Sequence, residues 1–135
     1  MRSKGIVVRS VLRLCVVGIL LSTTSSSQGQ TLNWLLPGGG NWHDPNNWDG
    51  HRFPTLQDTV RVNQGEAQVI EPGGTAVAGE LHLATGDAND GKVRLDPNRM
   101  LRLKRQHGLI VGLRGQGEFT QLPGSQVVID DPQIL

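Results

Sequence analysis

The stretch GLIVGLRGQGEFTQLPGSQVVID, residues 108–130, decides the fold. Three short runs begin in it at Leu109, Glu118 and Val127, with glycines between the first two runs and Pro123 before the third. Each run is too short for a helix, and the Gly and Pro residues between the runs mark turns. This spacing predicts a chain that alternates strand and turn, and the stretch contains no catalytic constellation.

The same pattern extends upstream, because apolar and polar residues alternate in short runs throughout residues 58–130. Two such strands per winding predict a coil of about 20 residues, within the range of structural repeats. No window of about twelve or more residues free of Gly and Pro has the apolar spacing of an amphipathic helix. Inward-facing positions are expected near residues 60, 69, 81, 93, 101, 109, 119 and 127.

Two all-β architectures are compatible with these runs. An antiparallel β-sandwich predicts tight Asn-Gly or Asp-Gly hairpin turns, and Asp90-Gly91 is the one pair that fits this signal well. A parallel β-helix, or solenoid, needs no such turns. We therefore expect a parallel β-helix, with the antiparallel β-sandwich as the alternative.

The N-terminus has the features of a Sec-type signal peptide over residues 1–29. Basic residues precede an apolar core at residues 14–21, and small polar residues follow, with cleavage expected after Gly29 or Ser27. A membrane anchor is the alternative, but the apolar run is shorter than the ~20 residues of a span. The only cysteine, Cys15, lies in this segment, so we expect a secreted chain without disulfides and without a stable membrane span after cleavage.

Charge is distributed unevenly along the chain. Four of the 13 basic residues lie within the first fourteen positions, whereas all 12 acidic residues come later, so the remainder is mildly acidic. A mildly acidic exported domain has no general attraction to nucleic acid, which we therefore do not expect as a partner.

Residues 30–57 form a segment rich in Trp and Gly, in which Trp42 and Trp48 flank the turn Asp44-Pro45-Asn46-Asn47. Trp34 precedes them, and no other tryptophan occurs. One interpretation is a platform on which Trp42 and Trp48 stack against a carbohydrate. The other, which we favour, is a plug that closes the core, because the first coil of a solenoid has no neighbour on one side and needs a cap.

A basic run is the other candidate surface. It comprises Arg99, Arg102, Lys104 and Arg105, with Arg114 expected one coil later. Stacked coils would align these side chains into a ladder that contacts an acidic polysaccharide or a lipid head group. The alternative, which we favour, is a solvated face whose charges guard against edge pairing.

Enzymatic chemistry has little support in the sequence. Aromatic residues make up 4% of the chain, which argues against a deep aromatic-lined pocket. The carboxylates of Asp87, Asp90 and Asp96 are candidates for polysaccharide cleavage, but they lie in or beside turns with no aromatic residue nearby. The histidines fit none of the usual zinc spacings, so we expect no metal and no cofactor.

Two segments resemble a known family. The Trp, Gly-Gly-Asn-Trp, Asn-Asn-Trp and Pro pattern of residues 33–54, followed by Asp58-Thr59-Val60, resembles the N-terminal cap of secreted, autotransporter-like β-helix proteins of planctomycete-type bacteria. Residues 109–119 resemble the Gly-rich repeat of the same passenger-type proteins. The resemblance implies an extracellular right-handed parallel β-helix with coils at residues 58–130, followed by a tail at residues 131–135. Relatives usually carry more coils, so it also implies that this chain is a truncated or short form.

The expected function is a structural or adhesive β-helix module at the cell envelope, without catalysis. Its expected partners are extracellular polysaccharide or other envelope β-helix chains. A glycan-binding module that uses Trp42 and Trp48, or the basic face around Arg102, is the alternative, and a polysaccharide lyase-like enzyme is the third.

Overall fold

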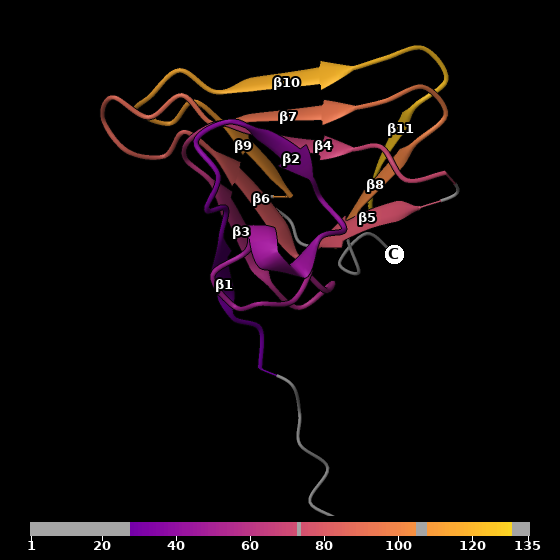
Figure 1. The fold of residues 1–135 in the computed structure, drawn as a ribbon, viewed down its shortest axis with the longest axis horizontal. Coiled ribbons are helices and arrows are strands. Elements are labelled where there is room, and N and C mark those ends of the chain that lie inside the picture. Colours follow the sequence, from indigo (N-terminus) through magenta and orange to yellow (C-terminus); the bar gives the residue numbers. More distant parts are fainter. Residues whose placement is uncertain (1–27, 73, 105–107, 131–135) are drawn as a thin grey trace, which may run out of the picture.

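The computed structural model describes residues 28–72, 74–104 and 108–130, which form a β-solenoid of about four turns. Its strands belong to three sheets, each named here in spatial order (Figure 1). The first sheet contains β1 (Thr31–Asn33), β3 (Thr59–Val62), β6 (Glu80–Leu83) and β9 (Leu109–Val111). The second contains β2 (Gly39–Asn41), β4 (Glu66–Val69), β7 (Lys92–Leu95) and β10 (Glu118–Gln121). The third contains β5 (Thr75–Ala78), β8 (Met100–Leu103) and β11 (Gln126–Ile129).

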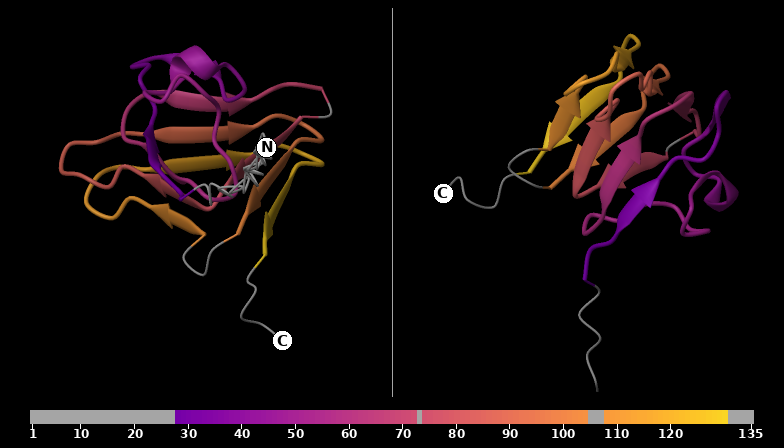
Figure 2. Two further views of the ribbon diagram at one scale, coloured as in Figure 1. Left: turned by 90° about the horizontal axis from the view of Figure 1, so that it is seen from below. Right: turned by 90° about the vertical axis from the view of Figure 1, so that its left-hand side faces the viewer.

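All paired strands in the described part of the chain run parallel, and each strand pairs with the strand one winding away. The predicted parallel β-helix is therefore confirmed, and the antiparallel sandwich is wrong. The coils follow one another along the axis in sequence order, so the N-terminal strands and β9 to β11 lie at opposite ends (Figure 2). Asp90-Gly91 is no hairpin; it leads directly into β7, whose neighbours β4 and β10 are both parallel to it.

The predicted coil length was too short because a complete winding has three strands rather than two. In the second sheet, Ala67, Val93 and Phe119 are in register, and the spacing along the chain is the same in both steps. The first sheet is less regular, since Thr59 and its register partner Glu80 lie closer together in the sequence. The expected inward positions were placed correctly along the chain, but they were divided into the wrong number of strands per winding.

The core lies inside the coil and is built by alternation along each strand. In β7, for example, Val93 and Leu95 are buried, whereas Lys92 and Arg94 are only partly covered. Burying apolar surface stabilises the fold by about 25 cal/mol per Å². Inward side chains of successive windings lie in register above one another, and this stacking increases the apolar surface that is buried. The valine and leucine residues with no exposed surface are Val60, Val62, Val69, Leu81, Leu83, Leu95, Leu101 and Leu103.

Glycines mark the corner between the first and second sheets. Gly65, Gly91 and Gly117 each come directly before a strand of the second sheet. The residue after Gly91 donates its N–H to the carbonyl of Gly65, and the residue after Gly117 donates its N–H to the carbonyl of Gly91. The windings approach so closely here that a Cβ on Gly91 would lie 1.7 Å from the carbonyl oxygen of Val62. A residue without a side chain is required where two backbones meet in this way.

The corner between the second and third sheets is a proline turn. Asn98 and Gly124 each follow a proline and have positive φ values of 60° and 77°. Ser125 closes the later turn by donating its N–H to the carbonyl of Leu122 at 3.1 Å. Proline before a residue with positive φ is the signature of a type II turn, so these residues set the direction of the chain into the third sheet.

Candidate functional site

The N-terminal end of the coil stack is closed by three tryptophans. The ring of Trp48 lies 5.0 Å from the rings of both Trp34 and Trp42, edge to face in each case. Trp48 also donates its indole N–H to the carbonyl of Trp42 at 2.9 Å. All three side chains are at most 3% exposed, so the plug interpretation is confirmed. The interpretation of Trp42 and Trp48 as a carbohydrate platform is wrong, because buried rings offer no face to a sugar.

The same segment forms hydrogen bonds with the end of β1 and the residues just after it. Asn47 lies at the end of the short 3-10 helix η1 (Pro45–Asn47), which Asp44 caps by accepting the N–H of Asn46 at 2.9 Å. The N–H of Leu35 donates to the carbonyl of Asn47 at 2.9 Å, and the N–H of Asp49 donates to the carbonyl of Asn33 at 3.1 Å. These bonds occupy backbone groups of Asn33 and Leu35 that would otherwise be free to pair with another strand.

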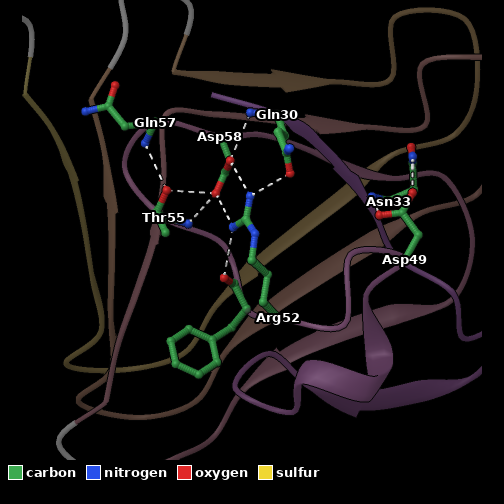
Figure 3. Close-up of polar contacts among 8 residues, drawn as sticks. Gln30, Asn33, Asp49, Arg52, Thr55, Gln57 and Asp58 are labelled. Atoms are coloured by element: carbon green, nitrogen blue, oxygen red, sulfur yellow. Dashed lines mark hydrogen bonds and ion pairs between the residues drawn. The ribbon is translucent and has the colours of Figure 1, made fainter. Parts of the chain in front are cut away.

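Arg52 and Asp58 fasten this segment to the first complete winding (Figure 3). Both terminal guanidinium nitrogens of Arg52 donate to the buried carboxylate of Asp58, at 2.7 and 2.8 Å. The carboxylate also accepts the backbone N–H groups of Gln30 and Thr55 and the hydroxyl of Thr55. These bonds, led by the one from Arg52, hold the pKa of Asp58 well below its usual range. Sequence reasoning found Asp58 only as part of a family pattern and missed Arg52.

The predicted basic ladder is not formed. Arg102 is in register with Val77 on one side and Val128 on the other, so its neighbours on the outer face are aliphatic. Its guanidinium is paired with the carboxylate of Asp130. Arg99 donates to the carbonyl of Ile70 at 3.2 Å. The expected alignment fails because register, rather than proximity in sequence, decides which side chains stack.

Arg114, the member expected one coil later, does not extend this surface. Lys104 is half-buried directly after β8, and Arg105 lies outside the described residues. Arg114 is exposed in the connection from β9 to β10, whereas Arg102 belongs to the third sheet.

The candidate carboxylates do not converge. Asp96 accepts a bond from Arg94 at 2.9 Å and begins the proline turn, whereas Asp87 and Asp90 lie in the connection from β6 to β7 at the other corner. No group of three His, Cys, Asp or Glu residues suited to holding a metal ion occurs in the described part of the chain. Asp90 shares a polar hollow with Glu118, whose carboxylate is paired with Lys92.

A shallow polar hollow lies at the corner between the first and second sheets. Its volume is about 480 Å³, and a neighbouring hollow of about 400 Å³ shares Asp90 and Gln116 with it. Beside the second hollow, Lys92 lies 3.2 Å from Glu118, and its hydrogen bond lowers the pKa of that carboxyl. The first hollow is lined by Ala88, Asn89, Asp90, Arg114, Gly115 and Gln116.

The last winding of the described part of the chain contains β9, β10 and β11, each at the edge of its sheet, and no described strand pairs with their outer edges. Leu103 is fully buried, but Ile129, its register partner in the last winding, is 50% exposed. Val111 is likewise exposed although its register partner Leu83 is buried. Within the described residues, this winding therefore presents partly uncovered core side chains beside unpaired backbone groups.

Comparisons of the chain with protein-family models, with curated proteins and with solved structures found no match. Among the described residues, no helix has the length and apolar character that crossing a membrane demands.

Proposed function

We propose that this chain is an exported structural or adhesive module at the cell envelope, built on a rigid β-coil. The observation that carries the proposal is the fold itself, a parallel β-coil of about four turns whose N-terminal core is covered by buried tryptophans. The first coil of a solenoid has no neighbour on one side and needs such a cap.

The rest of the described structure supports a scaffold rather than a reaction centre. The polar side chains with several bonds, such as Asp58, hold backbone segments together. The signal-like residues 1–29 support export, and the absence of cysteine beyond that segment makes the fold independent of oxidation.

Export is tested by expressing the full chain with a C-terminal tag in a Gram-negative host and measuring the mass of its N-terminal peptide in each cell fraction. We expect the tagged chain outside the inner membrane, beginning at Gln30 or Gln28. A chain that keeps Met1 and stays in the cytoplasm would contradict the proposal.

Glycan binding is the second candidate, and the polar hollow favours it. Its lining combines the amides of Asn89 and Gln116 with the charged side chains of Asp90 and Arg114, which can donate to and accept from sugar hydroxyl and carboxylate groups. No aromatic ring lines it, so the stacking energy that tightens many sugar sites is missing.

A glycan array with the full chain tests this candidate. Binding of uronic acid polymers that Arg114→Ala abolishes would support a site at the hollow, with Arg61→Ala as the exposed control on the first sheet. Binding that Arg114→Ala leaves unchanged would contradict it.

A further inference from the structure

We propose that Asp58 and Arg52 form a binding site for the N-terminus that signal cleavage creates, with the α-ammonium group of Gln30 on the Asp58 carboxylate. The inference goes beyond the scaffold role, because it assigns a site and a processing position, and it rests on the export in the proposed function. The leader is expected to be removed after Gly29 or after Ser27. The contacts of Gln30 favour the first of these two bonds.

Gln30 is the first of the described residues that the fold holds by hydrogen bonds. Its N–H donates to Oδ1 of Asp58 at 3.0 Å, and its backbone carbonyl accepts the N–H of Thr59 at 2.9 Å. Its side-chain oxygen accepts from Nη2 of Arg52 at 3.2 Å (Figure 3). The two described residues before it are exposed and bond to no other described residue. Cleavage directly before Gln30 therefore costs none of these contacts and frees the nitrogen that already lies on Asp58.

The carboxylate of Asp58 is a charged acceptor in a covered position. Its side chain is 2% exposed, and because its pKa lies well below the usual range it stays ionised at neutral pH. In the uncleaved chain it receives only a neutral amide N–H from Gln30. Cleavage replaces that amide by an ammonium group, and hydrogen bonds with charged partners are roughly twice as strong as neutral ones. Removal of the leader thus strengthens the contact that fixes the start of the chain.

Arg52 is the opposing charge at this site. Its Nη2 donates to the same Oδ1 of Asp58 at 2.8 Å, so the guanidinium and the new ammonium group of Gln30 share one oxygen. The ammonium contacts the carboxylate directly, whereas that oxygen separates the two cations, and Coulomb energies fall with distance. Gln30 is exposed and the Arg52 side chain is 37% exposed, so water screens their repulsion. Attraction to Asp58 therefore prevails and raises the pKa of the amine.

Peptide mass spectrometry of the exported, C-terminally tagged chain locates the new N-terminus. We expect it at Gln30, with the mass of an intact glutamine. A start at Gln28 or at another exported position would overturn the site and leave export standing, whereas a chain that keeps Met1 in the cytoplasm would overturn both. A Gln30 that has lost ammonia would also overturn the site. In that case the amine has attacked the side-chain amide carbon and expelled its nitrogen, and the resulting lactam carries no charge.

The pKa of the Gln30 amine is the direct measure of binding. It is obtained from the rate of acylation by a water-soluble succinimidyl ester over a series of pH values, read from the N-terminal peptide. In the free tripeptide Gln-Thr-Leu, which has the sequence of residues 30–32, the midpoint should lie at about 7.7–8.0. We expect a midpoint at least about one unit higher in the folded chain. Steric shielding alone would slow the acylation without moving the midpoint.

Asp49→Asn is the matched control, because Asp49 accepts bonds from Asn33 in the same segment rather than from Gln30. It should leave the midpoint high, whereas Asp58→Asn should return it to the tripeptide value. If Asp58→Asn does not fold, the comparison of the unmodified chain with the tripeptide still decides. Equal midpoints for those two, or a midpoint that falls in Asp49→Asn and stays high in Asp58→Asn, would overturn the site.

Discussion

The carbonyl oxygen of Val62 lies directly over Gly91, at a separation that leaves no room for a side chain on the glycine. A Cβ there would approach the oxygen to 1.7 Å and the amide nitrogen of Asn63 to 2.9 Å. Val62 ends a strand of one winding and Gly91 precedes a strand of the next. The contact brings the backbones of two windings together at the corner between the first two sheets.

Gly91→Ala should therefore separate the two windings at this corner and destabilise the protein by about 3 kcal/mol or more, since neither backbone can move without breaking ladder bonds. Gly38→Ala is the matched control, because nothing lies within 4 Å of a Cβ at that position. Urea denaturation of both variants measures the difference. Equal free energies of unfolding would contradict the close approach.

Asp58 should make the stability depend on acidity. Its folded-state pKa lies below the value of about 3.9 in an unfolded chain, so its contribution is complete above that pH and is lost as the pH falls further. Asp58→Asn should lower the free energy of unfolding by roughly 2–4 kcal/mol at neutral pH, because Arg52 and two backbone N–H groups lose a charged acceptor.

The measurement for Asp58 is urea denaturation at neutral pH and at about pH 3. The stability difference between Asp58→Asn and the unmodified chain should narrow at the lower pH. The exposed Asp87→Asn is the control and should change stability by less than about 0.5 kcal/mol. A difference for Asp58→Asn that does not change with pH would contradict this role of the carboxylate.

Trp48 should be the most costly of the aromatic residues to remove. Trp48→Ala leaves a cavity between Trp34 and Trp42 and deletes the bond to the carbonyl of Trp42, so we expect a loss of about 3–5 kcal/mol. Phe53→Ala, at a half-exposed ring, should cost less than about 1 kcal/mol. Similar melting temperatures for the two variants would show that the tryptophans do not close the core.

Heparin retention tests the basic face. We expect Arg102→Ala combined with Lys104→Ala to leave weak retention unchanged, because Arg102 is neutralised by Asp130 and has aliphatic register neighbours. Asp130→Asn should instead raise the salt concentration needed for elution, since it releases the guanidinium. A marked loss of heparin retention in the double variant would contradict this expectation and support the basic ladder.

The sequence predicted strands from the alternation of residues such as Val93, Arg94 and Leu95, and the structure buries the first and third of these. The scarcity of Asn-Gly and Asp-Gly turns favoured the parallel β-helix over the sandwich. It failed on the number of strands per winding. The signal was present, since Gly65, Gly91 and Gly117 recur at a constant interval, but the shorter gaps between neighbouring apolar pairs concealed that longer period.

The candidate surfaces were harder to predict. Trp42 and Trp48 had two interpretations because a sequence does not state whether a ring is covered, and burial decided for the plug. Arg102 and Lys104 were placed on one face correctly in principle, but the residues stacked above and below Arg102 come from strands a full winding away in the sequence. Arg52 and Asp58 are separated by a short segment with no local pattern that pairs them.

The sequence by itself determined which residues point inward, because strand alternation is a local property of neighbouring residues. It also determined where the chain turns, because Gly, Pro and Asn control the backbone angles at single positions. Only the tertiary structure decided which side chains share a column and which strands pair. These depend on register between windings, and register is set by packing and hydrogen bonding between segments far apart in the chain.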